Sequence, residues 1–281
     1  MCAYTQALAD HEDDINQLNV FPVADADTGS NMFGTMRGVT DAIDTMPGDM
    51  AEVAKKIRRA ALMSAKGNSG IILSQWLRGF TAHLAETGDA SPKELSAAIT
   101  AASDSAYSAV EEPKEGTILT VARVAAETSA AAVDAGVRDV WVAAAQGGDA
   151  ALMETPEHLA VLREHGVVDS GGYGLAVLFE VASGGPVKSM RCHSAAISFD
   201  DASGGFYEVT FLLEAEDAAP LRARWSEIGD SIDITGGDDG DPYACHVHTA
   251  DVGAAIEAGI EAGRPFRIQV TELPGKNRAD G

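Results

Sequence analysis

The chain of 281 residues has few basic residues, few cysteines and no long apolar run. Its 20 Lys and Arg residues stand against 43 Asp and Glu residues, which gives a formal net charge of −23 at pH 7. Such an acidic protein repels nucleic acid and anionic membrane surfaces, so neither is expected as a partner. A phosphate ligand would therefore depend on metal ions and backbone dipoles rather than on a cluster of cations.

The small number of cysteines and the lack of long apolar runs indicate in which cellular compartment the protein is expected. Only Cys2, Cys192 and Cys245 occur, too few and too scattered for a disulfide framework, which predicts a reducing, cytoplasmic environment. No run of 18 apolar residues appears, and the N-terminal stretch MCAYTQALADHEDDINQ has no uninterrupted apolar core. The sequence therefore predicts neither a membrane span nor a signal peptide.

The composition and the hydrophobic periodicity of the sequence change once, near residue 182. Residues 1–182 are rich in alanine with helical periodicity, and their Gly, Pro and Asp punctuation predicts eight or nine helices. Short connections favour antiparallel neighbours, so we expect an all-α antiparallel, up-and-down bundle or barrel. Within it, Ser91 as N-cap, Pro92 at the first helical position and Glu94 two residues later predict a capping box.

The remainder of the chain predicts a second, α+β domain. Residues 183–205 are rich in Gly and Ser and are interpreted as a linker, and residues 273–281 as a disordered tail. Between them, the predicted strands are 206–214, 231–235, 243–248 and 266–271, and the predicted helices are 217–228 and 250–262. The resulting order, βαββαβ over residues 206–272, is that of the ferredoxin-like split fold.

The stretch LNVFPVADADTGSNM, residues 18–32, places two carboxylates just before a predicted helix start. Because Pro22 disfavours a continuing helix, we expect Asp25 and Asp27 on an extended segment, where alternate side chains point the same way. Two carboxylates suit Mg²⁺, which completes its octahedron with water and substrate phosphates. Residues 28–31 add small side chains and free backbone N–H groups, which favour anions. A surface turn rich in Asp is the alternative interpretation.

Three further junctions of small residues precede predicted helices. They are KGNSG at 66–70, EGT at 115–117 and VDSGG at 168–172. Each fits a phosphate site at a helix N-terminus, and each also fits a plain helix cap with a glycine for close packing. Four such starts can form one nucleotide site only if they share an end of the bundle.

Several of these segments carry a resemblance to a known family. Residues 19–32 resemble the signature LNVFPVPDGDTGTNM of the DhaL-type ATP-binding domain, found in dihydroxyacetone kinases and in bacterial fatty acid kinase. Residues 67–80, 115–121 and 166–172 match the fatty acid kinase branch in order, and residues 229–231 and 245–249 resemble its middle domain. The resemblance covers residues 12–272, and the branch's C-terminal domain is expected to be missing.

The resemblance implies an eight-helix barrel that binds ATP or ADP with two Mg²⁺ ions at one end. It assigns Asp25 and Asp27 as catalytic, metal-binding carboxylates and places Asn19 near a third metal-ligand position. The implied nucleotide pocket adds Thr28, Gly29, Ser30, Asn31, Asn68, Ser69, Gly116, Thr117, Asp169, Ser170 and Gly171. Ala24 and Ala26 replace the Pro and Gly of the signature, and a positive φ at Ala26 would cost about 1–2 kcal/mol.

A second metal site is implied in the middle domain. His246 and His248 alternate along one predicted strand and so face one side, while Cys245 faces the other. In the family this pair binds zinc with a cysteine from a YCTEF strand, which here reads YEVTF at 207–211, so Glu208 replaces the thiolate. A zinc site of two His and one Glu fits this pattern. A His pair hydrogen-bonded to its surroundings is the alternative.

Three functions remain open at this point. The first is a kinase subunit that phosphorylates a fatty acid carboxylate presented by a separate DegV-type lipid-binding protein; such an acceptor is ionised near pH 7 and needs no general base. The second is a dihydroxyacetone (glycerone) kinase subunit whose sugar-binding domain lies on another chain. The third is a non-catalytic nucleotide-binding regulatory module. The resemblance also implies a homodimer.

Overall fold

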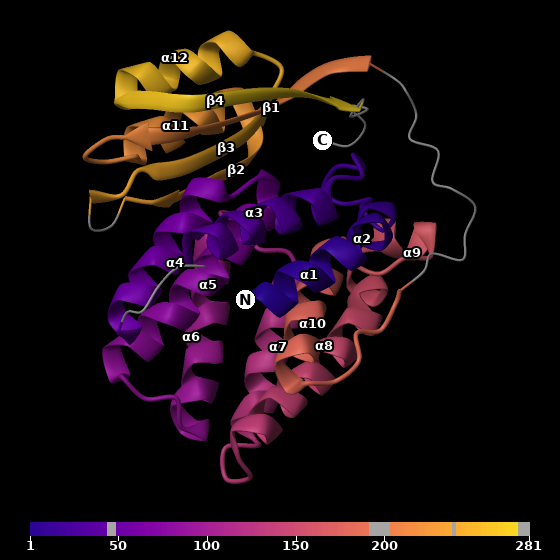
Figure 1. Ribbon diagram of the computed structural model, residues 1–281. Coiled ribbons are helices and arrows are strands. Elements are labelled where there is room, and N and C mark those ends of the chain that lie inside the picture. Colours follow the sequence, from indigo (N-terminus) through magenta and orange to yellow (C-terminus); the bar gives the residue numbers. More distant parts are fainter. Residues whose placement is uncertain (44–48, 191–202, 238–239, 275–281) are drawn as a thin grey trace. The chain divides into compact units, whose positions relative to one another are not determined.

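The computed structural model describes residues 1–43, 49–190, 203–237 and 240–274, which form two compact units (Figure 1). The first is mainly helical and holds α1 (Cys2–Asp10), α2 (Glu12–Gln17), α3 (Thr28–Ile43), α4 (Met50–Ser64), α5 (Gly67–Thr87), α6 (Pro92–Ala109), α7 (Ile118–Ala130), α8 (Val137–His158), α9 (Ala160–His165) and α10 (Ser170–Ser183). The second holds β1 (Ser203–Glu214), α11 (Ala219–Ile228), β2 (Gly229–Gly236), β3 (Tyr243–Thr249), α12 (Val252–Ala262) and β4 (Arg264–Pro274).

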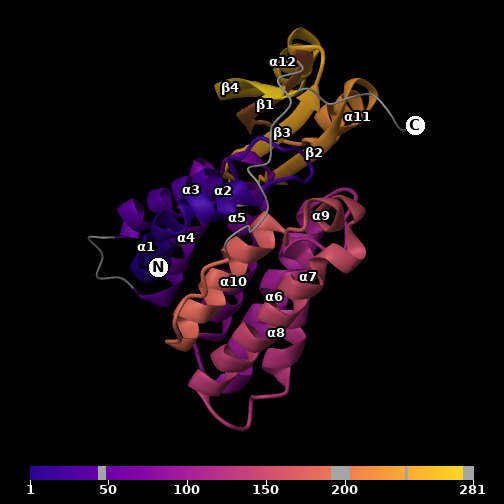
Figure 2. The same ribbon diagram turned by 90° about the vertical axis from the view of Figure 1, so that its right-hand side faces the viewer.

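Eight helices of the first unit close into a ring, with their long members side by side (Figure 2). Helix α3 packs against α4, α4 against α5, α7 against α8, α8 against α10, and α10 against α1 and α3. Two close approaches complete the ring. Gly79 of α5 lies so near the Ala101 carbonyl of α6 that a Cβ would overlap it, and Ser96 Oγ of α6 lies 3.0 Å from Ser129 Oγ of α7. The predicted all-α barrel is confirmed.

The helical unit has ten helices in its described residues, against the eight or nine predicted. The extra ones arise from two breaks. His11 (φ −113°, ψ 9°) separates α1 from α2, and Leu159, with extended backbone, separates α8 from α9. Pro156 in the last turn of α8 has no backbone N–H to donate, which weakens the helix just before it ends.

The start of α6 differs in detail from the prediction. Pro92 is its first residue, as expected. The Ser91 N–H, however, donates to Asp89 Oδ1 at 2.9 Å, and Glu94 Oε2 lies 3.0 Å from His83 Nε2. Asp89 therefore takes the place predicted for Glu94, and the capping box was wrong in its partners.

The second unit is a four-stranded antiparallel sheet in the order β2-β3-β1-β4, with α11 and α12 on one face. The core on that face contains Val209, Phe211, Leu213, Leu221, Trp225, Ile232, Ile234, Cys245, Val247, Ala255 and Ala258. The predicted βαββαβ order is confirmed. The first and last strands along the chain extend beyond the prediction: β1 begins at residue 203, inside the predicted linker, and β4 ends at residue 274, inside the predicted tail.

The described helices were also searched for membrane spans. None of them combines the length and the apolar character that crossing a membrane requires. Of the three cysteines, Cys192 lies outside the described residues.

Candidate functional site: four helix starts and a histidine pair

The starts of α3 and α10 meet through their side chains. Ser170 Oγ donates to Thr28 Oγ1 at 3.2 Å, a contact between buried residues 142 positions apart in the chain. Thr28 is the first residue of α3 and Ser170 the first of α10. Two of the predicted nucleotide-binding segments therefore lie at the same end of the barrel.

Side chains of α2 hold the first turn of α3 in place, and the sequence did not predict these contacts. Asn16 Oδ1 accepts hydrogen bonds from the N–H groups of Gly29 at 2.7 Å and Ser30 at 3.3 Å. Ser30 Oγ donates to Glu12 Oε1 at 2.6 Å. The expectation that these backbone N–H groups are free was wrong for three of the four residues: a side chain of α2 caps Gly29 and Ser30, and the Asn31 N–H donates to the Asp27 carbonyl at 2.8 Å. No local sequence pattern around Asn16 signals this contact.

The start of α5 lies against α3. A Cβ on Gly70 would come within 2.6 Å of Thr35 Oγ1 and 3.5 Å of the Asn31 carbonyl oxygen, so only glycine permits this approach. Gly67, the first residue of α5, has φ +56°, and Ser69 lies in the same turn. Asn68 Oδ1 is buried and accepts no hydrogen bond from the described residues. A hydrogen-bond donor or a cation of a bound ligand would stabilise a buried amide oxygen that lacks a partner within the protein.

Asp169 ties the start of α10 to the start of α7. As N-cap of α10, its Oδ2 accepts the Gly172 N–H at 2.7 Å, while its own N–H donates to Thr155 Oγ1 at 3.1 Å. Burial raises the pKa of Asp169 to about 7, although backbone hydrogen bonds from Gly172 and Ile118 oppose the shift. Ile118 opens α7, and a Cβ on Gly171 would lie 3.3 Å from it. All four predicted helix starts thus share one end.

The loop before α7 has little conformational freedom. Gly116 has φ +85°, and a Cβ there would lie 2.7 Å from His158 Cβ and 2.9 Å from the Thr155 carbonyl oxygen. Thr117 is the N-cap of α7; its Oγ1 accepts the Leu119 N–H at 3.3 Å and donates to the Lys114 carbonyl at 2.8 Å. Gly116 is thus required by both its backbone conformation and its close packing.

The predicted magnesium ligands lie in the connection between α2 and α3. Asn19 is buried, and its N–H donates to the Asn16 carbonyl at 3.1 Å. Asp25 and Asp27 flank Ala26 and are partly exposed. Ala26 has φ +55°, the left-handed conformation that its position in the signature implied. An L-residue there costs about 1–2 kcal/mol, so the connection is strained where glycine would not be.

A second cluster lies on the face of the sheet opposite its helices. The ligand atoms of Glu208, His246 and His248 lie within 4.8 Å of one another. His246 Nε2 is 3.0 Å from Glu208 Oε1, and its Nδ1 is 2.9 Å from the Ser231 carbonyl oxygen. Both histidines are buried, whereas Cys245 points into the core on the opposite face, as expected from strand alternation.

The electrostatics of this second cluster favour positive charge. Burial by itself lowers the pKa of His246, but the hydrogen bond and charge of Glu208, with the charge of Asp233, raise it above its ordinary value. Asp233 Oδ2 lies 3.9 Å from His246 Nδ1. Such a site stabilises either an imidazolium or a metal cation, and a metal would displace a proton to bind there.

Two protein-family models match this chain. Residues 22–184 match the model of the DAK2 domain, and residues 205–279 match the model of the FakA-like middle domain of fatty acid kinase. The first match spans all four helix starts, and the second spans the histidine pair.

Individual proteins show the same relationship. The chain is 33% identical over 298 residues to the protein YloV of Bacillus subtilis and 31% identical over 298 residues to an uncharacterized protein of Staphylococcus saprophyticus. These alignments cover 96% and 97% of the chain and 54% of each relative, so the chain spans about half the length of these relatives.

Among solved structures, the dihydroxyacetone kinase of C. freundii in complex with AMP-PNP and Mg²⁺ is similar to this chain. It aligns with a TM-score of 0.50 and 22% identity over 65% of this chain and 32% of that one. At this level of identity the likeness shows a shared fold.

Proposed function

Since this chain belongs to the DAK2 domain family, we propose that it is the ATP-binding subunit of a kinase, with the nucleotide at the shared end of α3, α5, α7 and α10. The convergence of these four helix starts carries the proposal. Helix N-termini stabilise phosphate through their dipoles and N–H groups. Side chains cap the N–H groups of Gly29, Ser30 and Gly172, so in this acidic chain with few cations we expect the helix dipoles and bound metal to hold the polyphosphate.

The donor chemistry near this end suits magnesium, and we propose two Mg²⁺ ions as cofactors. Asp25 and Asp27 offer hard carboxylate oxygens, and Asn19 offers an amide oxygen. Bound Mg²⁺ supplies neutralisation of phosphate charge during transfer. The Thr28–Ser170 hydroxyl pair, at the starts of α3 and α10, and the buried Asn68 amide oxygen, at the start of α5, would orient the nucleotide.

We propose that the acceptor is a fatty acid carboxylate presented by a separate DegV-type lipid-binding protein. The match to a fatty acid kinase middle domain supports this choice. A carboxylate oxygen would form a bond to the γ-phosphorus while the bond from phosphorus to the β,γ-bridging oxygen breaks, giving an acyl phosphate and ADP. Because the carboxylate is already ionised, no side chain has to accept a proton. The proposed kinase acts in the cytoplasm as a homodimer.

Formation of ADP tests this proposal directly. Wild-type protein with MgATP and a lipid-loaded DegV-type protein should release ADP, and Asp25→Asn and Asp27→Asn should each lower the rate by at least about tenfold, since carboxylates that hold the metal are lost. Unchanged rates in both variants would exclude the carboxylate mechanism. ADP release with dihydroxyacetone in place of the lipid carrier would identify a glycerone kinase instead. Nucleotide binding without transfer to either acceptor would identify a regulatory module.

We also propose that the cluster on the sheet binds zinc. The mutual approach of Glu208, His246 and His248 supports this proposal. The hydrogen bond from His246 Nδ1 to the Ser231 carbonyl is the outer contact that typically orients a metal-binding imidazole, and it directs Nε2 toward the other two ligands. Two His and one Glu form a known zinc donor set that leaves a fourth position for water or another ligand.

A further inference from the structure

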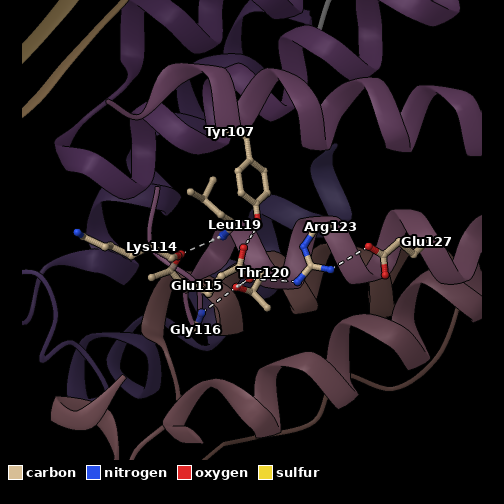
Figure 3. A network of polar contacts seen from close by, with 9 residues as sticks. Tyr107, Lys114, Glu115, Gly116, Leu119, Thr120, Arg123 and Glu127 are labelled. Carbon is tan, nitrogen blue, oxygen red and sulfur yellow. Dashed lines mark hydrogen bonds and ion pairs between the residues drawn. The ribbon is translucent and has the colours of Figure 1, made fainter. Parts of the chain in front are cut away.

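We propose that Glu115 is a positioning residue of the nucleotide site, which acts through Thr120 to fix the backbone of Gly116 at the start of α7. This inference rests on the proposed ATP-binding function and deepens it. Figure 3 shows the network: Glu115 accepts from Tyr107 Oη at 2.9 Å, from Thr120 Oγ1 at 2.7 Å and from Arg123 Nη2 at 3.1 Å. One carboxylate thus joins the last part of α6 to the first two turns of α7.

Thr120 transmits the effect of Glu115 to the loop. A threonine hydroxyl has one proton, and Thr120 gives it to Glu115. Its lone pairs are then directed to accept the Gly116 N–H, at 2.8 Å (Figure 3). Without the carboxylate, the hydroxyl would turn to donate to a backbone carbonyl one turn earlier, as threonines in helices commonly do. The lone pairs of the hydroxyl would then no longer be held toward the Gly116 N–H, and that hydrogen bond would weaken.

The network is too exposed to matter chiefly for global stability. The side chains of Glu115 and Arg123 are 48% and 42% exposed, and Glu127, which pairs with Arg123 at 2.8 Å, is 60% exposed. Exposed ion pairs contribute about 0–1 kcal/mol. Burial opposes ionisation of Glu115, but hydrogen bonds from Thr120, Arg123 and Tyr107 outweigh it and lower its pKa. The carboxylate therefore stays charged at neutral pH, and its main effect is local.

That local effect reaches the proposed nucleotide pocket because close packing restricts where the loop before α7 can lie. Gly116 packs against Thr155 and His158 with no room for a Cβ, and Thr155 Oγ1 accepts the Asp169 N–H. A shift of Gly116 would displace the first turn of α7 relative to that of α10. These are two of the four helix starts at which we place the phosphates.

Substitutions in the network separate a positioning role from a structural one. Thr120→Val keeps the shape but removes the hydroxyl, and Glu115→Gln removes the charge; Thr120→Ser restores the hydroxyl. Glu127→Gln is the matched control, since it removes a charge only from the outer contact with Arg123. In the full chain, we expect Thr120→Val and Glu115→Gln to speed amide hydrogen exchange in the 114–120 peptide. We expect their Kd for AMP-PNP with Mg²⁺ to rise about fivefold to tenfold, the equivalent of one hydrogen bond. Thr120→Ser and Glu127→Gln should match the wild type in both measurements.

The outcomes distinguish this inference from the function on which it rests. If wild-type protein binds AMP-PNP, and Thr120→Val and Glu115→Gln match Glu127→Gln in exchange and in Kd, the inference is overturned while the proposed function stands. If Thr120→Ser weakens binding as much as Thr120→Val, the hydroxyl is not the connection and the inference fails. Wild-type protein that binds no AMP-PNP overturns the proposed function and the inference together.

Discussion

The barrel end and the sheet face both gather polar side chains of the kinds that bind cations, yet they are assembled in opposite ways. The sheet cluster takes Glu208, His246 and His248 from two adjacent strands, where side-chain alternation brings them to one face. The barrel end brings together segments as far apart as Thr28 and Ser170 through helix packing. Its donors are carboxylates, amides and hydroxyls, whereas the sheet offers imidazoles. We therefore expect the sheet to select zinc and the barrel end to select magnesium.

The largest expected effect tests that division of metals. His246→Ala should abolish zinc binding, because it removes one of three ligands and leaves the Glu208 carboxylate unpaired. Magnesium-dependent AMP-PNP binding should be unchanged. Metal content by mass spectrometry after dialysis, together with calorimetric titration of AMP-PNP, checks both parts. Loss of nucleotide binding in His246→Ala would show that the two sites are not independent, and zinc retained by the variant would rule out the sheet site.

Glycine packing at the barrel end predicts the next largest effect. A Cβ on Gly29 would overlap the Glu12 carbonyl and lie 2.9 Å from Asn16 Oδ1, so Gly29→Ala should lower the free energy of unfolding by about 1–3 kcal/mol. A Cβ on Gly34 in the same helix would meet the Lys66 side chain no closer than 3.7 Å, so Gly34→Ala should raise stability by up to about 1 kcal/mol. Urea unfolding measures both. Equal effects of the two substitutions would contradict the close contact between α2 and α3.

The buried carboxyl of Asp169 makes stability depend on pH. Its pKa is about 7 in the folded protein, against about 3.9 for an ordinary Asp in the unfolded chain. Between these values the folded state holds more protons, so this group's contribution is lost as pH rises from about 4 to about 7. Asp169→Asn keeps an N-cap acceptor and cannot ionise. The free energy of unfolding of the variant, minus that of the wild type, should therefore be larger at pH 7.5 than at pH 4.5 by about 1 kcal/mol or more. A difference in unfolding free energy that is the same at both pH values would contradict the assignment.

The smallest effect comes from the strained residue between the two aspartates. Ala26→Gly removes the strain of a left-handed alanine, which is about 1–2 kcal/mol. Against this gain, glycine has more conformational freedom in the unfolded chain, which lowers stability by about 0.4–1 kcal/mol. The net expectation is a gain of about 0.5–1 kcal/mol, visible as a higher Tm. Ala24 is not among the described residues with positive φ, so Ala24→Gly should lower the Tm. A lower Tm for Ala26→Gly would show that the left-handed backbone is not what limits this connection.

The sequence predicted the elements of both sites better than their contacts. Strand alternation placed His246 and His248 on one face and Cys245 on the other, because the period of two is a local property. The role of Glu208 needed the resemblance to a family. Each helix start of the barrel end was visible from its glycines and small polar residues, but their convergence depends on tertiary packing between distant segments.

Most contacts that the sequence missed are made by side chains reaching between elements, as where Asn16 of α2 caps α3. One missed contact is local: Asp89, in the loop before α6, takes the Ser91 N–H that the capping rule assigns to Glu94. Glu115 belonged to a recognised motif, yet its bonds to Tyr107 and Arg123 depend on how α6 and α7 pack. Local rules describe backbone conformation well, and they fail where a neighbouring element supplies the hydrogen-bond partner.

Hydrogen exchange with and without AMP-PNP and Mg²⁺ tests the central claim, that four helix starts form one nucleotide site, most directly. We predict that nucleotide slows exchange together in the peptides that contain the starts of α3, α5, α7 and α10, and leaves the strands of the sheet unchanged. Protection at a single helix start, or protection confined to residues 203–274, would contradict the shared site.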